Sequence, residues 1–195
     1  FPLGGKMKKE AREIAEQLGF CNARKHDSQD ICFVPNGDYV KFMEQYTGKQ
    51  YPAGAFLDLE GQTVGRHCGA VRYTLGQRKG LGLAMGEPVY VCGKDMAANT
   101  VTVGPENALY SSMLLAEDMN WISIPQLKQP MRVKAKTRYR QAEQWAAVYP
   151  EQHGRVRLEF DAPQRAVTVG QAVVLYDGDV VVGGGTICQA PPTKR

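Results

Sequence analysis

The stretch MRVKAKTRYRQ, residues 131–141, decides the fold class of the C-terminal half because it alternates between two kinds of side chain. Successive side chains of a β-strand point to opposite faces, so the stretch predicts a strand with one cationic face. That face would carry Arg132, Lys134, Lys136, Arg138 and Arg140. Cations on one face repel one another, so a polyanion is a natural partner, and arginines favour phosphate. The alternative is a solvated strand whose charges prevent pairing at a sheet edge.

Short strands separated by turn signals are expected beyond this stretch. Their residues are 144–149, 155–160, 166–169, 172–176 and 179–182. Asp177-Gly178, between the last two, is a typical two-residue hairpin turn. Six short strands predict a small barrel or sandwich, and Pro125 and Pro130 bracket a boundary loop before it.

The N-terminal part combines helices with hairpins. Apolar residues recur at helical spacing over 6–18 and 38–46, and Gly19 and Gly48 are placed to end these helices. Two hairpins are expected next, over residues 55–66 and 89–103. The chain is therefore expected to be mainly β with a few helices.

Composition sets wide limits on function. The chain has 195 residues, 43% hydrophobic and 23% charged, which excludes wholesale disorder and leaves room for one or two domains. No stretch approaches the ~20 apolar residues of a membrane span. The net charge of +4 permits an anionic partner. Five cysteines without a CxxC pair are typical of free thiols in a reducing cytoplasm.

The cysteines and histidines are the candidate side chains for nucleophilic or metal-binding chemistry. Cys32 follows a polar run and precedes an apolar one, so it is either a partly exposed reactive thiol or a small core residue. The other cysteines are expected in the core: Cys21, Cys68, Cys92 and Cys188. The only close pair of metal-ligand types is His67-Cys68, whose side chains would point to opposite faces of a strand. A metal site is therefore not expected.

The glycine cluster GQRKGLG, residues 76–82, allows two interpretations. Its spacing matches neither a P-loop nor a dinucleotide-binding fingerprint, and no helix is expected after it. It is either a tight turn whose glycines adopt positive φ, or a loop that presents Arg78 and Lys79 to phosphate with Arg72 behind them.

Three separate motifs, in order, carry a resemblance. They are DSQDICF (27–33), YTLGQRKGLG (73–82) and KTRYRQ (136–141), and VGQ (169–171) with three glycines at 183–185 extends the match. Their order and spacing over nearly the whole chain resemble the bacterial tRNA-specific 2-thiouridylases.

The resemblance implies a reaction and a set of site residues. In that family an ATP-pyrophosphatase domain, working with ATP and Mg²⁺, activates C2 of the wobble uridine, and persulfide sulfur replaces its oxygen. The resemblance assigns the persulfide to Cys32, and contacts to the tRNA anticodon loop to Arg138, Tyr139 and Gln171. The basic strand adds Arg140 and Lys136 as expected RNA contacts, and the glycine loop adds Arg78 and Lys79. The resemblance also implies a sulfur-relay donor protein as a partner and a cytoplasmic location, and it implies no membrane partner.

Departures from the family pattern limit what this chain should do. The Ser-Gly-Gly-x-Asp-Ser loop that binds ATP in the family is missing from the sequence. The family also has an earlier catalytic cysteine that partners the persulfide cysteine, and the surroundings of Cys21 do not match those of that residue. Gln29-Asp30 stands where other members carry Thr-Gly, and Asp30 disfavours a thiolate beside it. We therefore expect the C-terminal part of a 2-thiouridylase that is inactive alone.

The expected organisation has four segments. Residues 1–46 are a remnant of the α/β catalytic domain with the cysteine motif, 47–115 a small β-rich central domain, 116–188 an antiparallel β-barrel, and 189–195 a flexible tail. Two alternatives are a stand-alone RNA-binding β module with a structural Cys32, and a small thiol redox protein.

Overall fold

A computed structural model describes residues 2–25, 34 and 38–191 of the chain. The chain divides into two compact units, with the boundary between Gln50 and Tyr51. None of the helices in the described ranges is long and apolar enough to cross a membrane.

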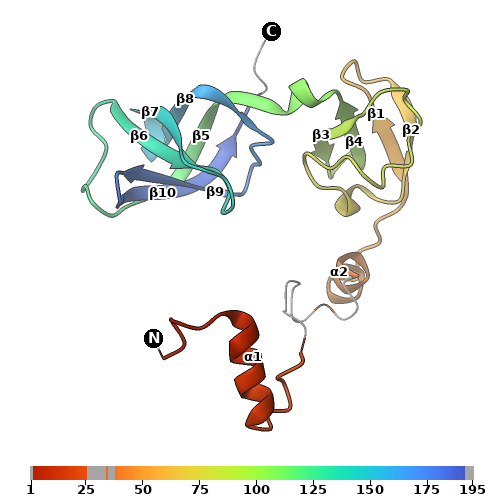
Figure 1. The fold of residues 1–195 in the computed structure, drawn as a ribbon. Coiled ribbons are helices and arrows are strands. Elements are labelled where there is room, and N and C mark those ends of the chain that lie inside the picture. The colour runs from red at the N-terminus through yellow and green to blue at the C-terminus, as the bar shows by residue number, and fades with distance from the viewer. Residues whose placement is uncertain (1, 26–33, 35–37, 192–195) are drawn as a thin grey trace. The chain divides into compact units, whose positions relative to one another are not determined.

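Two helices form the described part of the first unit (Figure 1): α1, Lys8–Gln17, and α2, Tyr39–Thr47. The Asp38 carboxylate accepts a hydrogen bond from the Lys41 N–H at 3.0 Å and caps the start of α2. Gly48, with φ of 67°, ends it in the left-handed conformation that favours glycine. Both predicted helices are confirmed, with their ends shifted by one or two residues.

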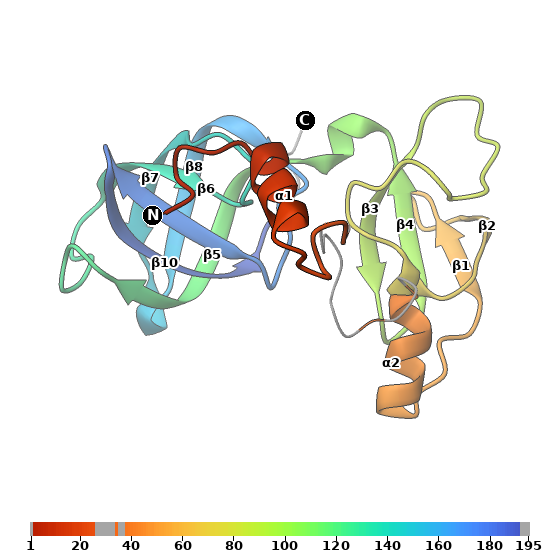
Figure 2. The same ribbon diagram turned by 60° about the horizontal axis from the view of Figure 1, so that its bottom comes forward.

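The second unit begins with a four-stranded sheet of order β2-β1-β4-β3. Its strands are β1 Gly54–Leu57, β2 Thr63–His67, β3 Tyr90–Asp95 and β4 Thr100–Gly104. β1 pairs with β2 and β3 with β4 in antiparallel fashion, which confirms both predicted hairpins, while β1 and β4 run parallel and join them. The long connection between β2 and β3 contains only the short 3-10 helix η2, Ala70–Arg72 (Figure 2).

The sheet buries a small core of its own. Its fully buried side chains include Phe56, Val91, Val101 and Val103. His67 belongs to this core: its Nδ1 accepts the Gly69 N–H at 3.0 Å, and its ring lies edge-on to Phe56. Burial lowers the pKa of His67, so the imidazole is held neutral.

The remaining strands close into a barrel of order β10-β5-β8-β7-β6-β9 (Figure 1). They are β5 Tyr110–Trp121, β6 Met131–Lys136, β7 Gln144–Pro150, β8 Val156–Arg165, β9 Ala172–Asp177 and β10 Val180–Gln189. Every neighbouring pair is antiparallel. The barrel buries Leu114, Leu158, Leu175 and Ile187 among others. The expected fold class, mainly β with an antiparallel barrel and a separate β sheet, is confirmed.

The glycine triplet in β10 permits close packing of neighbouring backbone. A side chain on Gly183 would lie 2.6 Å from the Asn120 carbonyl oxygen, and one on Gly184 would lie 2.8 Å from that of Val173. Only glycine fits such an approach without moving backbone.

Three details of the predicted strands were wrong. β6 ends at Lys136 rather than at residue 141, because the chain turns there and the Gln141 N–H donates to the Arg138 carbonyl. Residues 166–169 are not a strand, since β8 continues to Arg165 and Ala166 then adopts a φ of 52°. β5 was not predicted, because its sequence YSSMLLAEDMNW does not alternate cleanly.

Candidate nucleic-acid interface

The cationic face of β6 lies on the outside of the barrel. Val133 and Ala135 are buried in the core, while the intervening residues Arg132, Lys134 and Lys136 face outward. This confirms the predicted alternation as far as Lys136. β6 pairs with β7 on one side and β9 on the other, so it is not an edge strand. The interpretation that its charges prevent edge pairing is therefore wrong.

A carboxylate from another strand meets this face. Arg132 donates two hydrogen bonds to the carboxylate of Asp161 on β8. The same hydrogen bonds lower the pKa of Asp161 and raise that of Arg132. The five predicted cations thus do not form one uninterrupted repulsive row, because one is paired and two lie beyond the end of the strand.

The turn after β6 is anchored by a buried chain of polar side chains. The Thr137 hydroxyl donates to Gln141 Oε1 at 2.8 Å, and the Gln141 amide donates to Gln164 Oε1. Gln164 in turn donates to the Ala162 carbonyl at 2.5 Å. Thr137 and Gln164 are only 2% and 4% exposed, so this chain fixes the turn from within.

The turn presents its middle residues to solvent. Tyr139 is 95% exposed, and it makes no hydrogen bond or ring contact with any residue that the structure describes. Arg138 and Arg140 flank it and are also exposed. An exposed aromatic ring between two guanidinium groups is suited to stacking on a base while phosphates are neutralised beside it.

Arg138 is held in place by a second turn. Its Nη2 donates to the Ala166 carbonyl at 2.6 Å and to the Thr168 hydroxyl at 3.3 Å. The Thr168 hydroxyl donates to the same Ala166 carbonyl at 3.0 Å. Ala166 is itself fixed, since it is buried and its N–H donates to the Leu109 carbonyl at 2.7 Å.

Gln171 lies on the segment that leads away from this contact. Its N–H donates to the Thr168 carbonyl at 3.2 Å, and its own carbonyl accepts the Ile187 N–H at 2.8 Å. The side chain of Gln171 is exposed. The motifs KTRYRQ and VGQ, about 30 residues apart in the chain, are therefore joined through Thr168.

The glycine loop reaches Ala166 from the side of the sheet. Gly76 has a φ of 83°, and a methyl group on it would lie 3.2 Å from the Ala166 Cβ. The Gly76 N–H donates to the Val91 carbonyl on β3, and the Val91 N–H donates to the Gln77 carbonyl. Three motifs that are distant in sequence thus meet around one alanine.

The glycine loop is a tight turn. The Gln77 side chain accepts the Thr74 N–H at 3.0 Å and donates to the Lys79 carbonyl at 3.0 Å. Glycines 76, 80, 82 and 86 all have positive φ, which confirms the first interpretation of the cluster. Arg78 and Lys79 are exposed, whereas Arg72 donates to the Cys68 carbonyl. Contact of Arg78 and Lys79 with phosphate stays a prediction.

The cysteines fall into three groups. Cys32 lies outside the described residues. Cys21 and Cys68 are exposed, so the expectation that they belong to a core was wrong. Cys92 and Cys188 are half-buried, and burial raises the pKa of both thiols, which disfavours the nucleophilic thiolate.

No cluster of three or more metal-ligand side chains occurs among the residues that the structure describes. His67 is buried at the end of β2, whereas Cys68 lies just beyond that strand and is exposed.

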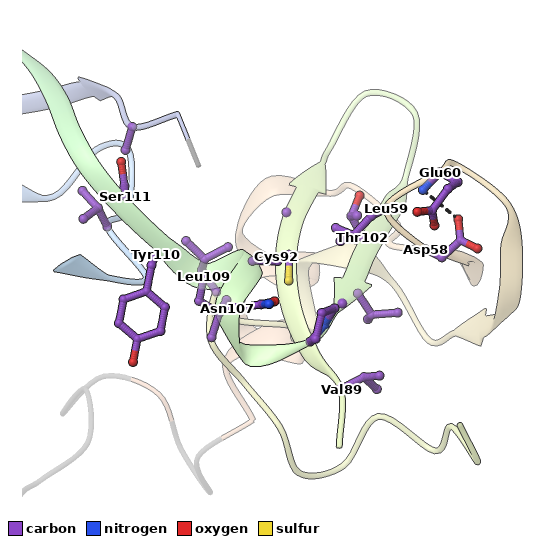
Figure 3. A pocket seen from close by; sticks show the side chains of 18 of the residues that line it. Asp58, Leu59, Glu60, Val89, Cys92, Thr102, Asn107, Leu109, Tyr110 and Ser111 are labelled. Atoms are coloured by element: carbon purple, nitrogen blue, oxygen red, sulfur yellow. Dashed lines mark hydrogen bonds between the residues drawn. The ribbon is translucent and has the colours of Figure 1, made fainter. Parts of the chain in front are cut away.

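A pocket of about 1140 Å³ lies in the second unit, between the sheet and one end of the barrel (Figure 3). Its charged lining consists of Asp58 and Glu60, and no lysine, arginine or histidine lines it. The Asp58 carboxylate accepts the Glu60 N–H at 3.0 Å, so it is already occupied. This pocket does not fit an anionic ligand, and none of the turn residues 137–141 lines it.

Sequence reasoning missed residues that hold or extend the basic surface. Nothing in the sequence marks Ala166 as a residue with positive φ, because alanine rarely adopts that conformation. Trp145 could have been found, because it alternates with the apolar residues Ala146 and Val148 in a predicted strand and should therefore face outward.

Family models match three consecutive parts of the chain. Residues 111–187 match an aminomethyltransferase beta-barrel domain, and residues 40–105 match a tRNA methyl transferase PRC-barrel domain. Residues 1–36 match a tRNA methyl transferase HUP domain.

Curated relatives carry the name tRNA-specific 2-thiouridylase MnmA. The chain is 53% identical over 186 residues to that of Acetivibrio thermocellus, covering 95% of this chain and 52% of the relative. It is 52% identical over 189 residues to that of Heliobacterium modesticaldum, covering 96% and 49%. The chain thus spans about half the length of the curated relatives it matches. With three consecutive domain matches and this degree of identity, the chain belongs to the tRNA-specific 2-thiouridylase family.

Proposed function

We propose that the chain is the tRNA-binding part of a tRNA 2-thiouridylase, a sulfurtransferase that replaces the C2 oxygen of the wobble uridine with persulfide sulfur in an ATP-dependent reaction. The observation that carries this proposal is the meeting of three motifs at Ala166 beside the exposed turn of Arg138 and Tyr139. The anticodon loop is the RNA target, because its unpaired bases can stack on protein rings.

Each contact has a distinct role in this proposal. Arg138 binds phosphate with the donors that Ala166 and Thr168 leave free, and its fixed position reduces the entropy lost on binding. Tyr139 stacks on an unpaired base, and the exposed amide of Gln171 donates to or accepts from a base edge. The exposed cations Arg140, Arg78 and Lys79 and the half-buried Lys136 add phosphate contacts. Such contacts far from the reacting atoms position the target base.

Cys32 is proposed as the persulfide carrier. A persulfide attacks only when it is deprotonated and aimed at an activated carbon, so it depends on the RNA contacts to bring the uridine to it. A sulfur-relay donor protein would load it, and the family's earlier cysteine would be its disulfide partner. The free-thiol pattern of the sequence supports the cytoplasm as the compartment.

The residues present do not fit the ATP and Mg²⁺ that the family reaction requires. The described residues contain no cluster of three metal-ligand side chains, and the sequence contains no Ser-Gly-Gly-x-Asp-Ser loop. No step through ATP is therefore derived from this chain, and we expect it to be inactive alone.

The proposed division into segments 1–46, 47–115, 116–188 and 189–195 needs one adjustment. Residue 115 lies within β5, whose first residue is Tyr110. We propose that the sheet and barrel meet at the short 3-10 helix η3, Glu106–Leu109, instead.

Complementation tests the catalytic assignment. A full-length gene carrying Cys32→Ser, in a strain that lacks the enzyme, should give tRNA without 2-thiouridine. Cys21→Ser is the control, and it should retain the modification, because Cys21 does not match the family's second cysteine. Normal 2-thiouridine content with Cys32→Ser would overturn the role of Cys32.

Filter binding tests the RNA assignment against the two alternatives. The affinity of the chain for a tRNA transcript should fall steeply with salt, by a log–log slope of roughly 0.7–0.9 for each phosphate contact. Salt-sensitive binding together with normal thiolation by Cys32→Ser would favour the RNA-binding module. An affinity that is absent or indifferent to salt would favour the thiol redox protein.

A further inference from the structure

A row of cations and aromatic rings crosses the outer face of the barrel, and the proposed tRNA contacts account for only one member of it, Lys136. We call it the cation–aromatic row, and its members are Arg132, Lys134, Lys136, Trp145 and Tyr176. Lys134 lies directly opposite Trp145 on β7 and directly opposite Tyr176 on β9. Directly opposed residues share a face, so the row spans three adjacent strands.

The row is held together by cation–π contacts. The Arg132 guanidinium and the Lys134 ammonium lie 5.3 and 5.4 Å from the centroid of the Trp145 ring. The Lys136 ammonium lies 5.9 Å from that of Tyr176. These contacts keep the rings and charges side by side on one surface.

Two features of the row point to an anionic ligand with aromatic groups. Trp145 is 49% exposed, although a tryptophan side chain gains most when it is buried. Lys134 and Lys136 form no ion pair with any carboxylate of the described residues, whereas Arg132 is paired with Asp161. Protection of a sheet edge does not explain these lysines, because β6 is paired on both sides.

We propose that this row is a second RNA-binding surface, on which an unpaired nucleotide stacks on Trp145 while Lys134 and Lys136 bind flanking phosphates. Successive outward residues of a strand are about 7 Å apart, so the two lysines form a short cationic track. The track continues along the same strand into the turn of Arg138 and Tyr139. The inference rests on the proposed function, since it extends the footprint of the same tRNA.

The flexible side chain of Lys134 allows a base to replace it on the Trp145 ring. Lys134 can leave the Trp145 ring for a phosphate when a base takes its place, while Arg132 remains fixed by Asp161. Stacking of a base on an aromatic side chain contributes an affinity of roughly 5- to 150-fold per base.

Tryptophan fluorescence gives a direct readout, because the chain has only two tryptophans. In Trp121→Phe the remaining tryptophan is Trp145, and Trp121 itself packs against the barrel core. Titration with a tRNA transcript should quench its fluorescence saturably, at the same RNA concentration that gives half-saturation in filter binding. Binding of the transcript with unchanged fluorescence would overturn the second surface and leave the proposed function standing.

Variants separate stacking from charge. Trp145→Ala should weaken tRNA binding by roughly 5- to 150-fold, and Trp145→Phe should restore most of the affinity. Lys134→Gln should reduce the salt slope by roughly 0.7, whereas Lys128→Gln, a matched loss of charge at an exposed loop residue, should not change it.

The outcomes distinguish the two proposals. Wild-type affinity and slope in both Trp145→Ala and Lys134→Gln would overturn the second surface, and the row would then be open to a protein partner. No tRNA binding by the wild-type chain would overturn both the second surface and the proposed function.

Discussion

Replacement of Gly76 by alanine probes the meeting of the glycine loop with the turn that holds Arg138. Gly76 has a φ of 83°, which costs a residue with a side chain about 1–2 kcal/mol. The added methyl group would also lie 3.2 Å from the Ala166 Cβ and 3.4 Å from Arg165 Nη1. Crowding of this kind adds about 1 kcal/mol, because the neighbours must move.

Gly82→Ala is the matched control. Gly82 has a φ of 68° on the same loop, and no atom lies within 4 Å of the place its Cβ would take. Both variants therefore carry the backbone strain of a positive φ, but only the new methyl group of Gly76→Ala lies against Ala166. For a chain of this size the difference of about 1 kcal/mol corresponds to a Tm that is lower by roughly 2–4 °C.

Calorimetry and tRNA filter binding on the two variants test the contact. Gly76→Ala should have the lower Tm and the weaker affinity, because a displaced Ala166 carbonyl no longer holds Arg138. Gly82→Ala should bind tRNA like the wild type. Equal Tm values and equal affinities in the two variants would refute the role of Ala166 as the meeting point.

Two further predictions concern the buried polar groups. Gln164→Leu should lower the free energy of unfolding, measured in urea, by about 1–3 kcal/mol, because it leaves the Gln141 amide and the Ala162 carbonyl without partners. An unchanged midpoint with an unchanged slope of the urea transition would contradict the role of these hydrogen-bonded side chains. Burial lowers the pKa of His67, so its contribution to stability is complete above about pH 6.5 and declines as the pH falls below that value, where the unfolded chain binds the proton more readily. In His67→Gln the part of the fall in unfolding free energy that His67 causes, measured by urea unfolding between pH 7 and 5, should disappear. An identical fall in the variant and the wild type would exclude His67 as its source.

The sequence allowed a correct prediction of those features that depend on local pattern. Alternation placed Lys134 and Lys136 on the outer face of a strand, and helical spacing followed by Gly48 located a helix within one residue. β5 was missed because Ser111, Met113, Leu114 and Leu115 follow one another without alternating polarity, and its place is set by pairing with β8 and β10.

The candidate site could be predicted residue by residue but not as an arrangement. Family resemblance pointed to Arg138, Tyr139 and Gln171, yet nothing local indicated that Ala166 would adopt positive φ and join them to Gly76. The contact of Arg138 with Ala166 arises only once the barrel closes and brings β6 beside β9, and that of Gly76 needs the separate sheet as well, because these residues are far apart in the sequence. Alternation alone puts Trp145 at an outward position of its strand, but its place beside Lys134 depends on the pairing of β7 with β6.

Tyr139→Ala is the most direct test of the claim that this turn binds tRNA. The ring is 95% exposed and makes no hydrogen bond or ring contact with the described residues, so its removal should leave Tm unchanged and any effect on binding must come from the ligand. Tyr46→Ala, at a ring that is 80% exposed in the first unit, is the control.

Filter binding of a tRNA transcript to the two variants provides the measurement. Tyr139→Ala should lose about 1–3 kcal/mol of binding free energy, while Tyr46→Ala should bind like the wild type. Wild-type affinity in Tyr139→Ala, with the protein folded and the salt dependence unchanged, would contradict the assignment of this turn to tRNA binding.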